Sequence, residues 1–339
     1  MLKIEKKYNL TKLSTLKVKA VADFFAVICN KEDLFEAMEF SKKNKQKITI
    51  LGGGSNILFK KRVEGLVLKN EIKGMRIAED DKDRVLVEGL AGESWSKFVS
   101  FTVSHKIYGL ENLFLIYGTV GAAPVQNIGA YGVELKDVFH HLKAINLKTG
   151  SERIFSIADC HFGYRDSIFK NKLKGKYFIY SVTLSLSRKE NFKLDYGSIR
   201  EKLEDKGIKE PNAREVIKVI EEIRNSKLPN PHTFPNAGSF FKNPEISQTI
   251  FKKLLKLYPD IPSFPGVKNK IKIPAAWLID QAGFKGKKLG AARVYEKQAL
   301  IIINDGGASA QQILRLTDKV KLTVKEKFGI DLKEEINII

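Results

Sequence analysis

Three consecutive glycines, Gly52, Gly53 and Gly54, follow the short apolar run 48–51 and precede Ser55 and Asn56. Without a Cβ, such a turn lets the main chain approach a ligand closely. Its successive N–H groups can also form a nest that binds an anion. The spacing matches neither the G-x-G-x-x-G pattern nor a loop that ends in Gly-Lys-Ser/Thr. A phosphate site and a plain tight turn are therefore equally open readings.

A second glycine-rich segment, residues 117–132, reads YGTVGAAPVQNIGAYG and has no charge in a chain that is 29% charged. Most of its side chains are small, with amide and hydroxyl groups interspersed. Such a run suits a loop that packs against a large flat ligand and reads it with main-chain groups. The alternative is a buried glycine-rich crossover.

Three polar side chains have types suited to proton transfer or to the stabilisation of charge. Arg165 lies between Tyr164 and Asp166. A partly buried arginine can stabilise a developing oxyanion, although an Arg–Asp pair is more often structural. Ser239 lies in NAGSFFKNP, outside any G-x-S-x-G elbow and without a histidine at a telling spacing. It is therefore a poor nucleophile, but it could donate a proton. Glu335 lies at the chain end, where a solvated tail is the plain alternative.

The surrounding pattern predicts an α+β protein. Short apolar runs predict strands, and amphipathic runs predict helices. The strands are expected at 24–28, 48–51, 63–68, 85–87, 144–147, 152–155, 178–186 and 299–303, and the helices at 31–44, 94–105, 209–225, 245–257, 275–282 and 309–328. Residues 224–236, with three prolines, predict a loop.

Composition excludes several classes of protein. The chain has 339 residues, and Cys29 and Cys160 are too few for a disulfide framework and lack the spacing of a zinc site. A net charge of +20 would suit a nucleic-acid binder, but the basic residues are spread along the chain, and a lysine-rich surface with anionic ligands fits as well. No signal peptide is visible, and the uncharged stretch 112–133 contains four glycines and a proline, which makes it a poor membrane span. We expect a cytoplasmic protein with no metal site, no bound nucleic acid and no membrane insertion.

Taken together, these segments resemble the UDP-N-acetylenolpyruvoylglucosamine reductase family over nearly the whole chain, from Leu13-Ser14-Thr15 to Glu335-Ile336. The motifs stand in the family's order: LGGGSN, GTVGAAPVQNIGAYG, FGYRDSIF, LDYGSI, RNSKLPNP, NAGSFFKNP, AAWLIDQAGFKG, QALIIIN and LKEEI. The FGYRDSIF and LDYGSI segments are similar to the longer, type I form, in which a tyrosine-bearing loop closes over the substrate.

The resemblance implies an FAD-binding part of two subdomains, similar to vanillyl-alcohol-oxidase-type (PCMH) flavoproteins, and a C-terminal αβ substrate-binding domain. We place these parts at residues 1–70, 71–208 and 209–339. The implied reaction is the NADPH-dependent, FAD-mediated reduction of UDP-N-acetylglucosamine enolpyruvate to UDP-N-acetylmuramate, a step of peptidoglycan precursor synthesis. NADPH and the sugar nucleotide would use the same channel in turn, and a monomer is expected. A related FAD oxidoreductase with another substrate is the alternative.

The resemblance also assigns residues, motif by motif. Arg165 and Glu335 would stabilise the enediolate, Glu335 in its protonated form, and Ser239 would protonate the α-carbon, with Lys227 as a candidate neighbour. The implied substrate-binding residues are Tyr131, Tyr196 on the closing loop, Lys227, Asn243, Lys285 and Gln298. The implied FAD-binding residues are Gly52, Gly53, Gly54, Ser55, Asn56, Gly118, Thr119, Val120, Gly121, Ala122, Gln126, Asn127, Gly129 and Arg224.

Three positions depart from the family pattern. Tyr117 stands where the family usually has Pro, and Asn337 stands where a basic residue often follows the glutamate motif. The chain also stops at Ile339, soon after Glu335. A tail this short is expected to be prone to fraying.

Overall fold

The computed structural model describes all 339 residues, and the chain packs as two compact units. Unit 1 comprises residues 1–8, 22–53 and 64–226, and unit 2 comprises residues 9–21, 54–63 and 227–339. Each unit is thus assembled from segments that are distant in the sequence. The proposed three-part functional division at residues 70 and 208 stays a prediction.

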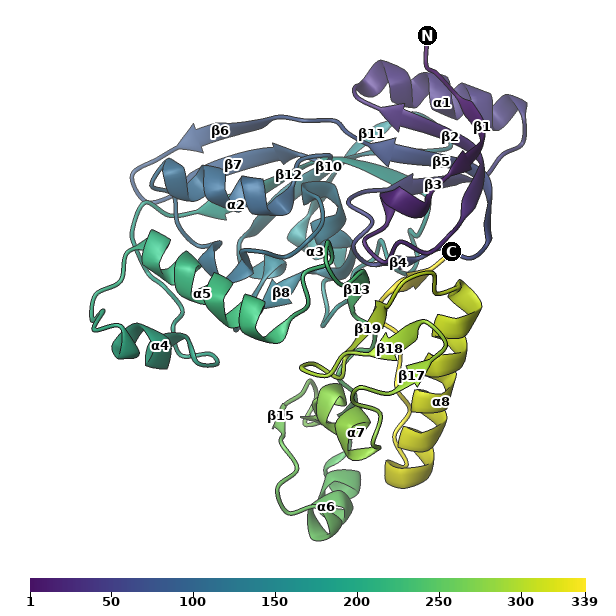
Figure 1. Ribbon diagram of the computed structural model, residues 1–339. Helices are drawn as coiled ribbons and strands as arrows, with labels where there is room; N and C mark the ends of the chain where they lie inside the picture. The colour runs from purple at the N-terminus through teal and green to yellow at the C-terminus, as the bar shows by residue number, and fades with distance from the viewer. The chain divides into compact units, whose positions relative to one another are not determined.

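The first sheet of unit 1 has the strand order β1-β2-β5-β3 (Figure 1). Its strands are β1 (Glu5–Asn9), β2 (Val21–Ile28), β3 (Ile48–Leu51) and β5 (Arg62–Asn70). Helix α1 (Lys31–Lys43) begins at Asn30, whose side chain accepts a hydrogen bond from the Asp33 N–H, and it buries Leu34 and Ala37. β3 pairs in parallel with β5, and Gly52 follows the carboxyl end of β3, where Leu51 is buried.

The second sheet of unit 1 is antiparallel, in the order β11-β10-β12-β7-β6. Its strands are β6 (Met75–Asp80), β7 (Val85–Leu90), β10 (Phe139–Asn146), β11 (Glu152–Ser156) and β12 (Tyr177–Leu186), with α3 (Ile157–Cys160) following β11. Helix α2 (Trp95–Ser104) buries Trp95, Phe98 and Val99 in the core that it shares with this sheet. The short strands β8 (Gly129–Ala130) and β9 (Val133–Glu134) form a hairpin, and the unit ends with α4 (Ile199–Asp205) and α5 (Ala213–Lys227).

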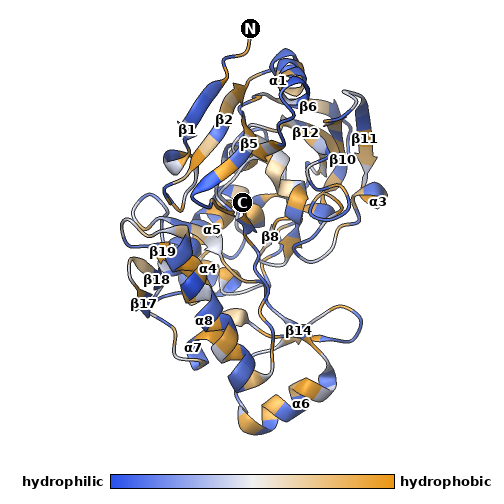
Figure 2. Cartoon of the chain, turned by 90° about the vertical axis from the view of Figure 1, so that its right-hand side faces the viewer, coloured by the Kyte–Doolittle hydropathy of each residue, from blue (hydrophilic) through white to orange (hydrophobic).

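The main sheet of unit 2 has the order β13-β19-β18-β17. It consists of β13 (Asn236–Ser239), β17 (Lys288–Leu289), β18 (Ala292–Val294) and β19 (Ile301–Asn304). Helices α7 (Ala275–Gln281) and α8 (Ala310–Phe328) bury apolar residues in the same core as this sheet. Ser309 and Gln312 form a capping box at the start of α8, and Gly329 ends the helix at φ 68°. Figure 2 shows both hydrophobic and hydrophilic residues along α8, as its amphipathic pattern predicts.

Two smaller sheets complete unit 2. One has the order β14-β16-β15, and its strands come just before and just after α6 (Gln248–Leu257) in the sequence. The other pairs β20 with β4 in parallel. Their strands are β4 (Ile57–Leu58), β14 (Glu245–Ile246), β15 (Phe264–Pro265), β16 (Ile271–Lys272) and β20 (Asn337–Ile338).

Most of the predicted elements are present, although several boundaries differ: the strand predicted at 144–147 begins at Phe139, and the one predicted at 24–28 begins at Val21. Three further differences have a local cause. The helix predicted from residue 245 begins at Gln248, because Ser247 caps it and Glu245–Ile246 form a strand. The helix predicted from residue 209 begins at Ala213, because the Asn212 side chain accepts the N–H groups of Arg214 and Glu215. The loop predicted from residue 224 begins only after Lys227, where α5 ends. The mixed α+β fold itself is confirmed.

No helix has the length and apolar character that crossing a membrane requires. The stretch 112–133 instead forms two short 3-10 helices and a hairpin. Both cysteines are free thiols, and burial raises the pKa of Cys160 to about 12.

Candidate active site

The two glycine-rich runs meet within unit 1. A Cβ built on Gly52 would lie 2.6 Å from Oγ1 of Thr119, and one on Gly53 would lie 2.9 Å from Cα of Gly118. Any larger residue at Gly52 or Gly53 would therefore push the two loops apart. Lys69 further holds the turn, since its Nζ donates to the carbonyl oxygen of Gly52 at 2.7 Å. The structure thus joins two motifs that the sequence could connect only through the family resemblance.

The continuation of the first run, Gly54, packs against the segment 13–15 within unit 2. Gly54 has φ 67°, and a Cβ there would lie 1.9 Å from the carbonyl oxygen of Leu13. The N–H of Thr15 donates to the carbonyl oxygen of Gly54 at 3.0 Å, and its hydroxyl donates to the carbonyl oxygen of Asn236 at 2.6 Å. Within unit 2, Thr15 therefore ties Gly54 to β13, which carries Ser239.

The second glycine-rich run forms a 3-10 helix over Val120–Gln126. The N–H of Gly121 donates to the carbonyl oxygen of Ala91, and a Cβ on Gly121 would lie 2.4 Å from Cβ of Ala91. Asn127 ends the helix at φ 46° and is fully buried. Its amide donates to Glu134 and to the carbonyl oxygen of Gly163, both at 3.0 Å, and accepts the N–H of Lys136. This side chain holds the loop in shape, so a cofactor contact of Asn127 would come from its main chain.

Arg165 lies in a tight turn that Gly163 and Asp166 close with two main-chain hydrogen bonds. Its backbone has φ 53°, an uncommon conformation for a residue with a side chain. Nη2 donates to the carbonyl oxygen of Gly129 at 2.7 Å, and the guanidinium lies 5.6 Å from the ring centre of Tyr164. The guanidinium is therefore fixed beside the second glycine-rich run, as a group that stabilises developing charge requires.

Arg224, Tyr131 and Arg165 lie close together in unit 1. Arg224 Nη2 donates to the carbonyl oxygen of Leu115 at 3.1 Å, and its side chain also hydrogen bonds with Tyr131. Burial lowers the pKa of Arg224, whereas the nearby Tyr131 and Tyr117 raise it, and Arg165 lowers it further. Burial raises the pKa of Tyr131, opposed by Arg224. Two guanidiniums and a neutral phenol suit an anionic ligand.

Tyr196 lies against the hairpin that carries Tyr131. A Cβ on Gly132, at φ 78°, would lie 3.3 Å from Cβ of Tyr196, and one on Gly197 would lie 3.7 Å from the ring of Tyr131. The Tyr196 side chain nevertheless remains 49% exposed. The structure therefore brings together Tyr131 and Tyr196, two of the predicted substrate-binding residues.

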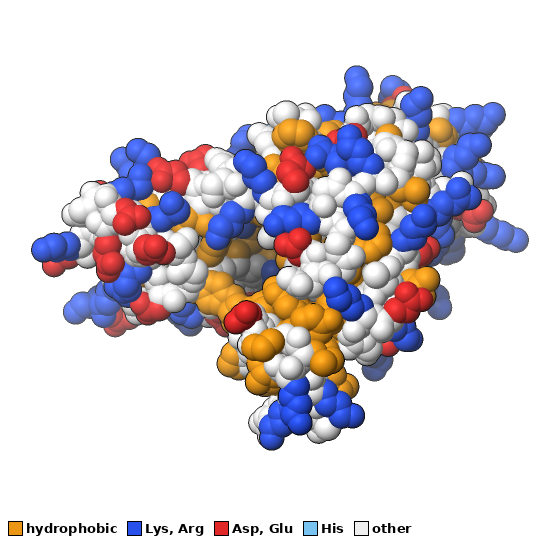
Figure 3. Space-filling view, turned by 60° about the horizontal axis from the view of Figure 1, so that its bottom comes forward, with side chains coloured by type: hydrophobic (Ala, Val, Ile, Leu, Met, Phe, Trp, Pro, Cys, Tyr) orange, Lys and Arg blue, Asp and Glu red, His pale blue; other side chains and the backbone are white.

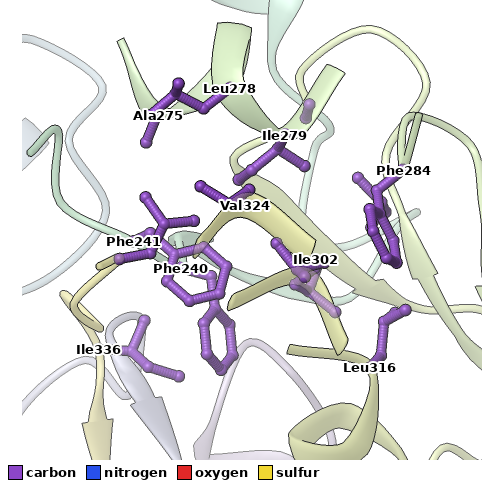
Figure 4. Close-up of a cluster of buried hydrophobic side chains, with 14 of the residues drawn as sticks. Phe240, Phe241, Ala275, Leu278, Ile279, Phe284, Ile302, Leu316, Val324 and Ile336 are labelled. Carbon is purple, nitrogen blue, oxygen red and sulfur yellow. The ribbon is translucent and has the colours of Figure 1, made fainter. Parts of the chain in front are cut away.

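Ser239 ends β13, where the strand departs from regular pairing. Asn236 and Ser239 pair with Ile303 and Ile301, with an irregularity between them, and Gly238 has φ 72°. Such a bulge re-aims the side chain that follows it. Phe240 and Phe241, next in sequence, are both buried in the unit 2 core with Ile336 (Figure 4). The two phenylalanines thus anchor the strand directly after Ser239.

The C-terminal tail pairs with the residues that follow Ser239. The N–H of Glu335 donates to the carbonyl oxygen of Phe240 at 2.8 Å, and the N–H of Lys242 donates to that of Lys333 at 2.9 Å. Glu334 forms an ion pair with Lys321 at 2.7 Å, and successive side chains of an extended segment face opposite ways. Glu335 is thereby paired through its main chain with Phe240, the residue that follows Ser239, so the structure brings together the two segments that carry these predicted catalytic residues.

The tail is held at its far end as well, which corrects the expectation that it would fray. Ile336 is buried, and Asn337 and Ile338 pair with Ile57 and Leu58. Asn337 donates to the carbonyl oxygen of Asn56 through both its N–H and its side-chain amide, at 3.0 and 3.2 Å. The residue that departs from the family pattern thus has a structural partner in the predicted cofactor turn.

The remaining predicted substrate residues lie on separate elements of unit 2. Asn243 Oδ1 accepts the N–H of Ala275 at the start of α7, at 2.9 Å. Lys285 pairs with Asp280 at 3.1 Å. Gln298 lies in the turn before β19, and its carbonyl oxygen accepts the N–H of Ile301, which pairs with Ser239. Lys227 is exposed at the end of α5.

The residues around the two glycine-rich runs fit a bound FAD. Their close packing leaves no space for a Cβ at Gly52, Gly53 or Gly121, so the main chain rather than side chains forms the surface there. A main chain packed in this way can approach a dinucleotide closely. Sequence reasoning gave no role to Thr15 or to Asn112. Thr15 could have been noticed because the resemblance to the family begins at Leu13-Ser14-Thr15. No group of three or more His, Cys, Asp or Glu side chains is arranged to hold a metal ion.

Comparisons with known proteins agree with this site. Residues 22–156 match the FAD binding domain model, which spans both glycine-rich runs, and residues 230–339 match the C-terminal domain model of UDP-N-acetylenolpyruvoylglucosamine reductase. The solved structure of that reductase from Thermus caldophilus has a TM-score of 0.69 at 22% identity and covers 100% of this chain and 99% of its own. A solvent-stable cholesterol oxidase has a TM-score of 0.51 at 10% identity, covering 98% and 87%.

The fold and the glycine-rich site together define an FAD-dependent oxidoreductase. Relatives that are similar over their whole length show which family of FAD-dependent oxidoreductases this is. The chain is 42% identical to the UDP-N-acetylenolpyruvoylglucosamine reductases of Pseudomonas aeruginosa, over 99% of both chains, and of Flavobacterium johnsoniae, over 100% of both. The chain belongs to the UDP-N-acetylenolpyruvoylglucosamine reductase family.

Proposed function

We propose that this chain uses NADPH to reduce the enolpyruvyl ether of UDP-N-acetylglucosamine enolpyruvate to the lactyl ether of UDP-N-acetylmuramate. Its place in the reductase family supports the reaction. The structural observation that carries the proposal is the pairing of the tail with residues 240–242, which brings the main chain of Glu335 beside Phe240, the residue that follows Ser239. A proton donor and a carboxyl group are the two groups that an enediolate intermediate needs close by.

FAD would be held by the main chain of the two glycine-rich runs, Gly52–Asn56 and Gly118–Gly129, with Arg224 beside them. Bound there, FAD would supply hydride transfer, first from NADPH and then to the β-carbon of the enolpyruvyl group. Asn127 shapes the second run through its three hydrogen bonds, and Lys69 holds the first. These residues act on the reaction by positioning the loops.

Arg165 would stabilise the negative charge that develops on the substrate carboxylate. Its guanidinium is already oriented by the carbonyl oxygen of Gly129 and by the turn between Gly163 and Asp166. Little reorientation is then needed when charge develops, which is the condition for strong electrostatic stabilisation. A lysine could not present the same planar set of donors.

Ser239 would donate the proton that the α-carbon receives. A serine hydroxyl is a weak acid, so the site must stabilise its alkoxide as the proton leaves. Lys227 is the candidate for that role, because an ammonium group is a compact point charge. Glu335, in its protonated form, would donate a hydrogen bond to the substrate carboxylate. Arg165 and Glu335 would then both stabilise the negative charge that develops on that carboxylate.

Tyr131, Tyr196, Lys227, Asn243, Lys285 and Gln298 would bind the sugar nucleotide. The contact between the Tyr131 hairpin and the Tyr196 loop supports a shared role for these two tyrosines. Asn243 donates no hydrogen bond in capping α7, so its amide nitrogen could serve the substrate. The lysines suit a diphosphate as mobile charges.

The proposed reaction places the chain in peptidoglycan precursor synthesis, and therefore in the cytoplasm, where nucleotide sugars are made. Any role in cell shape or division would follow from that pathway. Monomeric function is also proposed.

Product analysis tests the proposal. Purified protein loaded with FAD, NADPH and the enolpyruvyl sugar nucleotide should give a product heavier by two hydrogens, with one NADPH consumed per product. The Ser239→Ala variant is the control for a site-dependent reaction. Consumption of NADPH without the heavier product would contradict the proposed substrate.

A further inference from the structure

Asn112 connects two segments that are far apart in the sequence but lie together in unit 1. It is the middle residue of the 3-10 turn Glu111–Leu113, and its side chain is 3% exposed. Its amide nitrogen donates to the carbonyl oxygen of Tyr131 at 2.9 Å and to that of Lys193 at 2.8 Å. Both hydrogens of one amide group are therefore used to join two main-chain segments.

The two joined segments are those that carry Tyr131 and Tyr196. Lys193 lies three residues before Tyr196, and Gly132 directly follows Tyr131. On the Tyr196 side, Phe192 and Leu194 pack with Tyr131 against the apolar cluster that α4 and α5 form. The amide of Asn112 thus fixes the base of the loop at the point where the loop meets the hairpin.

The turn that carries Asn112 is itself firmly held. The Glu111 carboxylate accepts the N–H of Gly109 at 3.0 Å, and the Trp95 indole N–H donates to the carbonyl oxygen of Leu113 at 2.9 Å. Glu111 and Leu113 are both buried, and burial raises the pKa of Glu111. The segments that lead into the turn and into the Tyr196 loop are joined as well, because Tyr108 and Ser187 exchange main-chain hydrogen bonds. Asn112 is therefore a fixed donor rather than a mobile one.

We propose that Asn112 is a positioning residue for sugar-nucleotide binding, which holds the Tyr196 loop against the Tyr131 hairpin. The inference rests on the proposed function, since it takes Tyr196 to be a substrate contact. Asn112 touches neither cofactor nor substrate in this account. It acts by reducing the number of loop conformations that the substrate must select.

Asn112→Asp tests the proposal, because it keeps the shape of the side chain and removes both donors. Losing two hydrogen bonds is expected to raise KM for the sugar nucleotide on the order of tenfold, with kcat changed much less. Asn44→Asp is the control, since Asn44 donates one amide hydrogen bond, to the carbonyl oxygen of Phe40, at the exposed end of α1. An unchanged KM in folded, FAD-loaded Asn112→Asp would overturn the proposal.

A double-mutant cycle separates this proposal from the proposed function. If Asn112 acts through Tyr196, the Asn112→Asp/Tyr196→Phe variant should have a KM close to that of the worse single variant. Multiplicative effects would overturn the positioning role while leaving Tyr196 as a substrate contact. A normal KM for Tyr196→Phe alone, in a protein that still makes the product, would remove the proposed role of Tyr196 and with it this inference.

A measurement on the native holoenzyme covers the case in which Asn112 variants do not fold. The side-chain amide protons of Asn112 should exchange with solvent far more slowly than those of the exposed Asn44, and the sugar nucleotide should slow them further. Exchange as fast as that of Asn44 would show that the two hydrogen bonds do not persist, and would overturn the proposal.

Discussion

Among single residues, Ser239 and Glu335 carry the proposed proton transfer and charge stabilisation, and main-chain pairing brings their two segments together. Neither residue type is reactive by itself, and each has a common structural explanation when read alone. The main-chain hydrogen bond between Glu335 and Phe240 places the backbone of Glu335 next to the end of β13. Ser239 in turn follows a bulge with Gly238 at φ 72°. Chemistry at this site therefore depends on backbone geometry as much as on residue type.

Replacing Ser239 by alanine should separate the two half-reactions. NADPH should still reduce the flavin, because the variant leaves the glycine-rich runs intact, whereas re-oxidation by the sugar nucleotide should slow by about 10²–10⁴-fold, the usual contribution of a general acid. Stopped-flow absorbance measures both rates. Ser263→Ala, an exposed serine of unit 2, is the control. Equal slowing of both half-reactions would rule out the proton-donor role.

The sequence could supply candidates for these residues, but it could not place them. The NAGSFFKNP and LKEEI motifs indicated Ser239 and Glu335 only through the family resemblance, since about 95 residues separate them. Asn127 shows the opposite limit. It was assigned to the cofactor by motif, and the structure shows an amide fully engaged within the protein. A motif match indicates which residue takes part in a site, but it does not show which of that residue's atoms binds the cofactor.

At the scale of secondary structure, the short tail is the element that the catalytic proposal needs most. It pairs with residues 240–242, buries Ile336, and then pairs with β4 directly after the predicted cofactor turn. Removing it would take away the carboxyl group proposed for catalysis and also the hydrogen bonds that Asn337 donates to Asn56. In the proposed reaction, the tail would thus contribute a catalytic group while also holding Asn56.

Two changes in the tail should have different consequences. Glu335→Gln keeps every main-chain hydrogen bond, so FAD should remain bound while turnover falls, on the order of 10²-fold if one charge-stabilising group is lost. Deleting Glu335–Ile339 should also weaken FAD binding. Flavin content and turnover of the two variants measure this. Full flavin binding in the deletion variant would show that Asn56 does not need the tail.

The antiparallel sheet of unit 1 contains a buried carboxylate that links its own strand to three other strands. Glu88 on β7 is 6% exposed and accepts hydrogen bonds from Ser181 on β12 at 2.8 Å, Lys143 on β10 at 3.1 Å and Arg76 on β6 at 2.8 Å. Burial alone would raise its pKa, but the three donors outweigh burial and hold the pKa at about 2, below its ordinary 4.5. The network is thus a stability element that depends on pH.

The sign of that dependence follows from the lowered pKa. Glu88 stabilises the fold fully above its unfolded pKa of 4.5, and this contribution is lost as the pH falls from there through about 2. Allowing for the exposed side of Arg76, the loss should be about 2 kcal/mol. Urea unfolding across that range should show a weaker acid dependence for Glu88→Gln than for the native protein. Glu79→Gln, which removes an exposed ion pair with Arg84, is the control and should leave it unchanged.

Secondary-structure elements were predicted best where neighbouring residues alone define the element. Helices α1 and α8 have a capping residue and an amphipathic run, and both were placed to within one residue at each end. The start of α6 was missed because Glu245 and Ile246, which would fit a helix, pair with β16 instead. Similarly, Asn212 sets the start of α5 through its own hydrogen bonds. Tertiary pairing and capping chemistry decided these boundaries.

At the scale of the whole molecule, the chain is assembled discontinuously. Residues 9–21 and 54–63 pack with residues 227–339 in unit 2. The hydrogen bonds from Thr15 to Gly54 and Asn236, and from Asn337 to Asn56, are examples of this assembly. Hydrophobic periodicity is a local property and does not reveal such long-range pairing. The family resemblance supplied the fold, and the α+β class followed from the pattern alone.

The chain carries a net charge of +20. On the face shown in Figure 3, Lys and Arg side chains are scattered among acidic, hydrophobic and other side chains. A scattered positive charge would attract anionic substrates weakly over the whole surface, with the effect falling as salt screens it. The sugar nucleotide, NADPH and FAD are all anionic, which makes this distribution compatible with the proposed reaction.

In the proposed reaction, one FAD would carry electrons from NADPH to the enolpyruvyl sugar nucleotide. An anaerobic titration followed by visible absorbance measures this transfer. NADPH should bleach the flavin of the purified protein, and UDP-N-acetylglucosamine enolpyruvate, added next, should restore the yellow absorbance in stoichiometric amount. Bleaching without recovery would contradict the proposed substrate, and a protein that stays colourless even after FAD is added would contradict the flavin site itself.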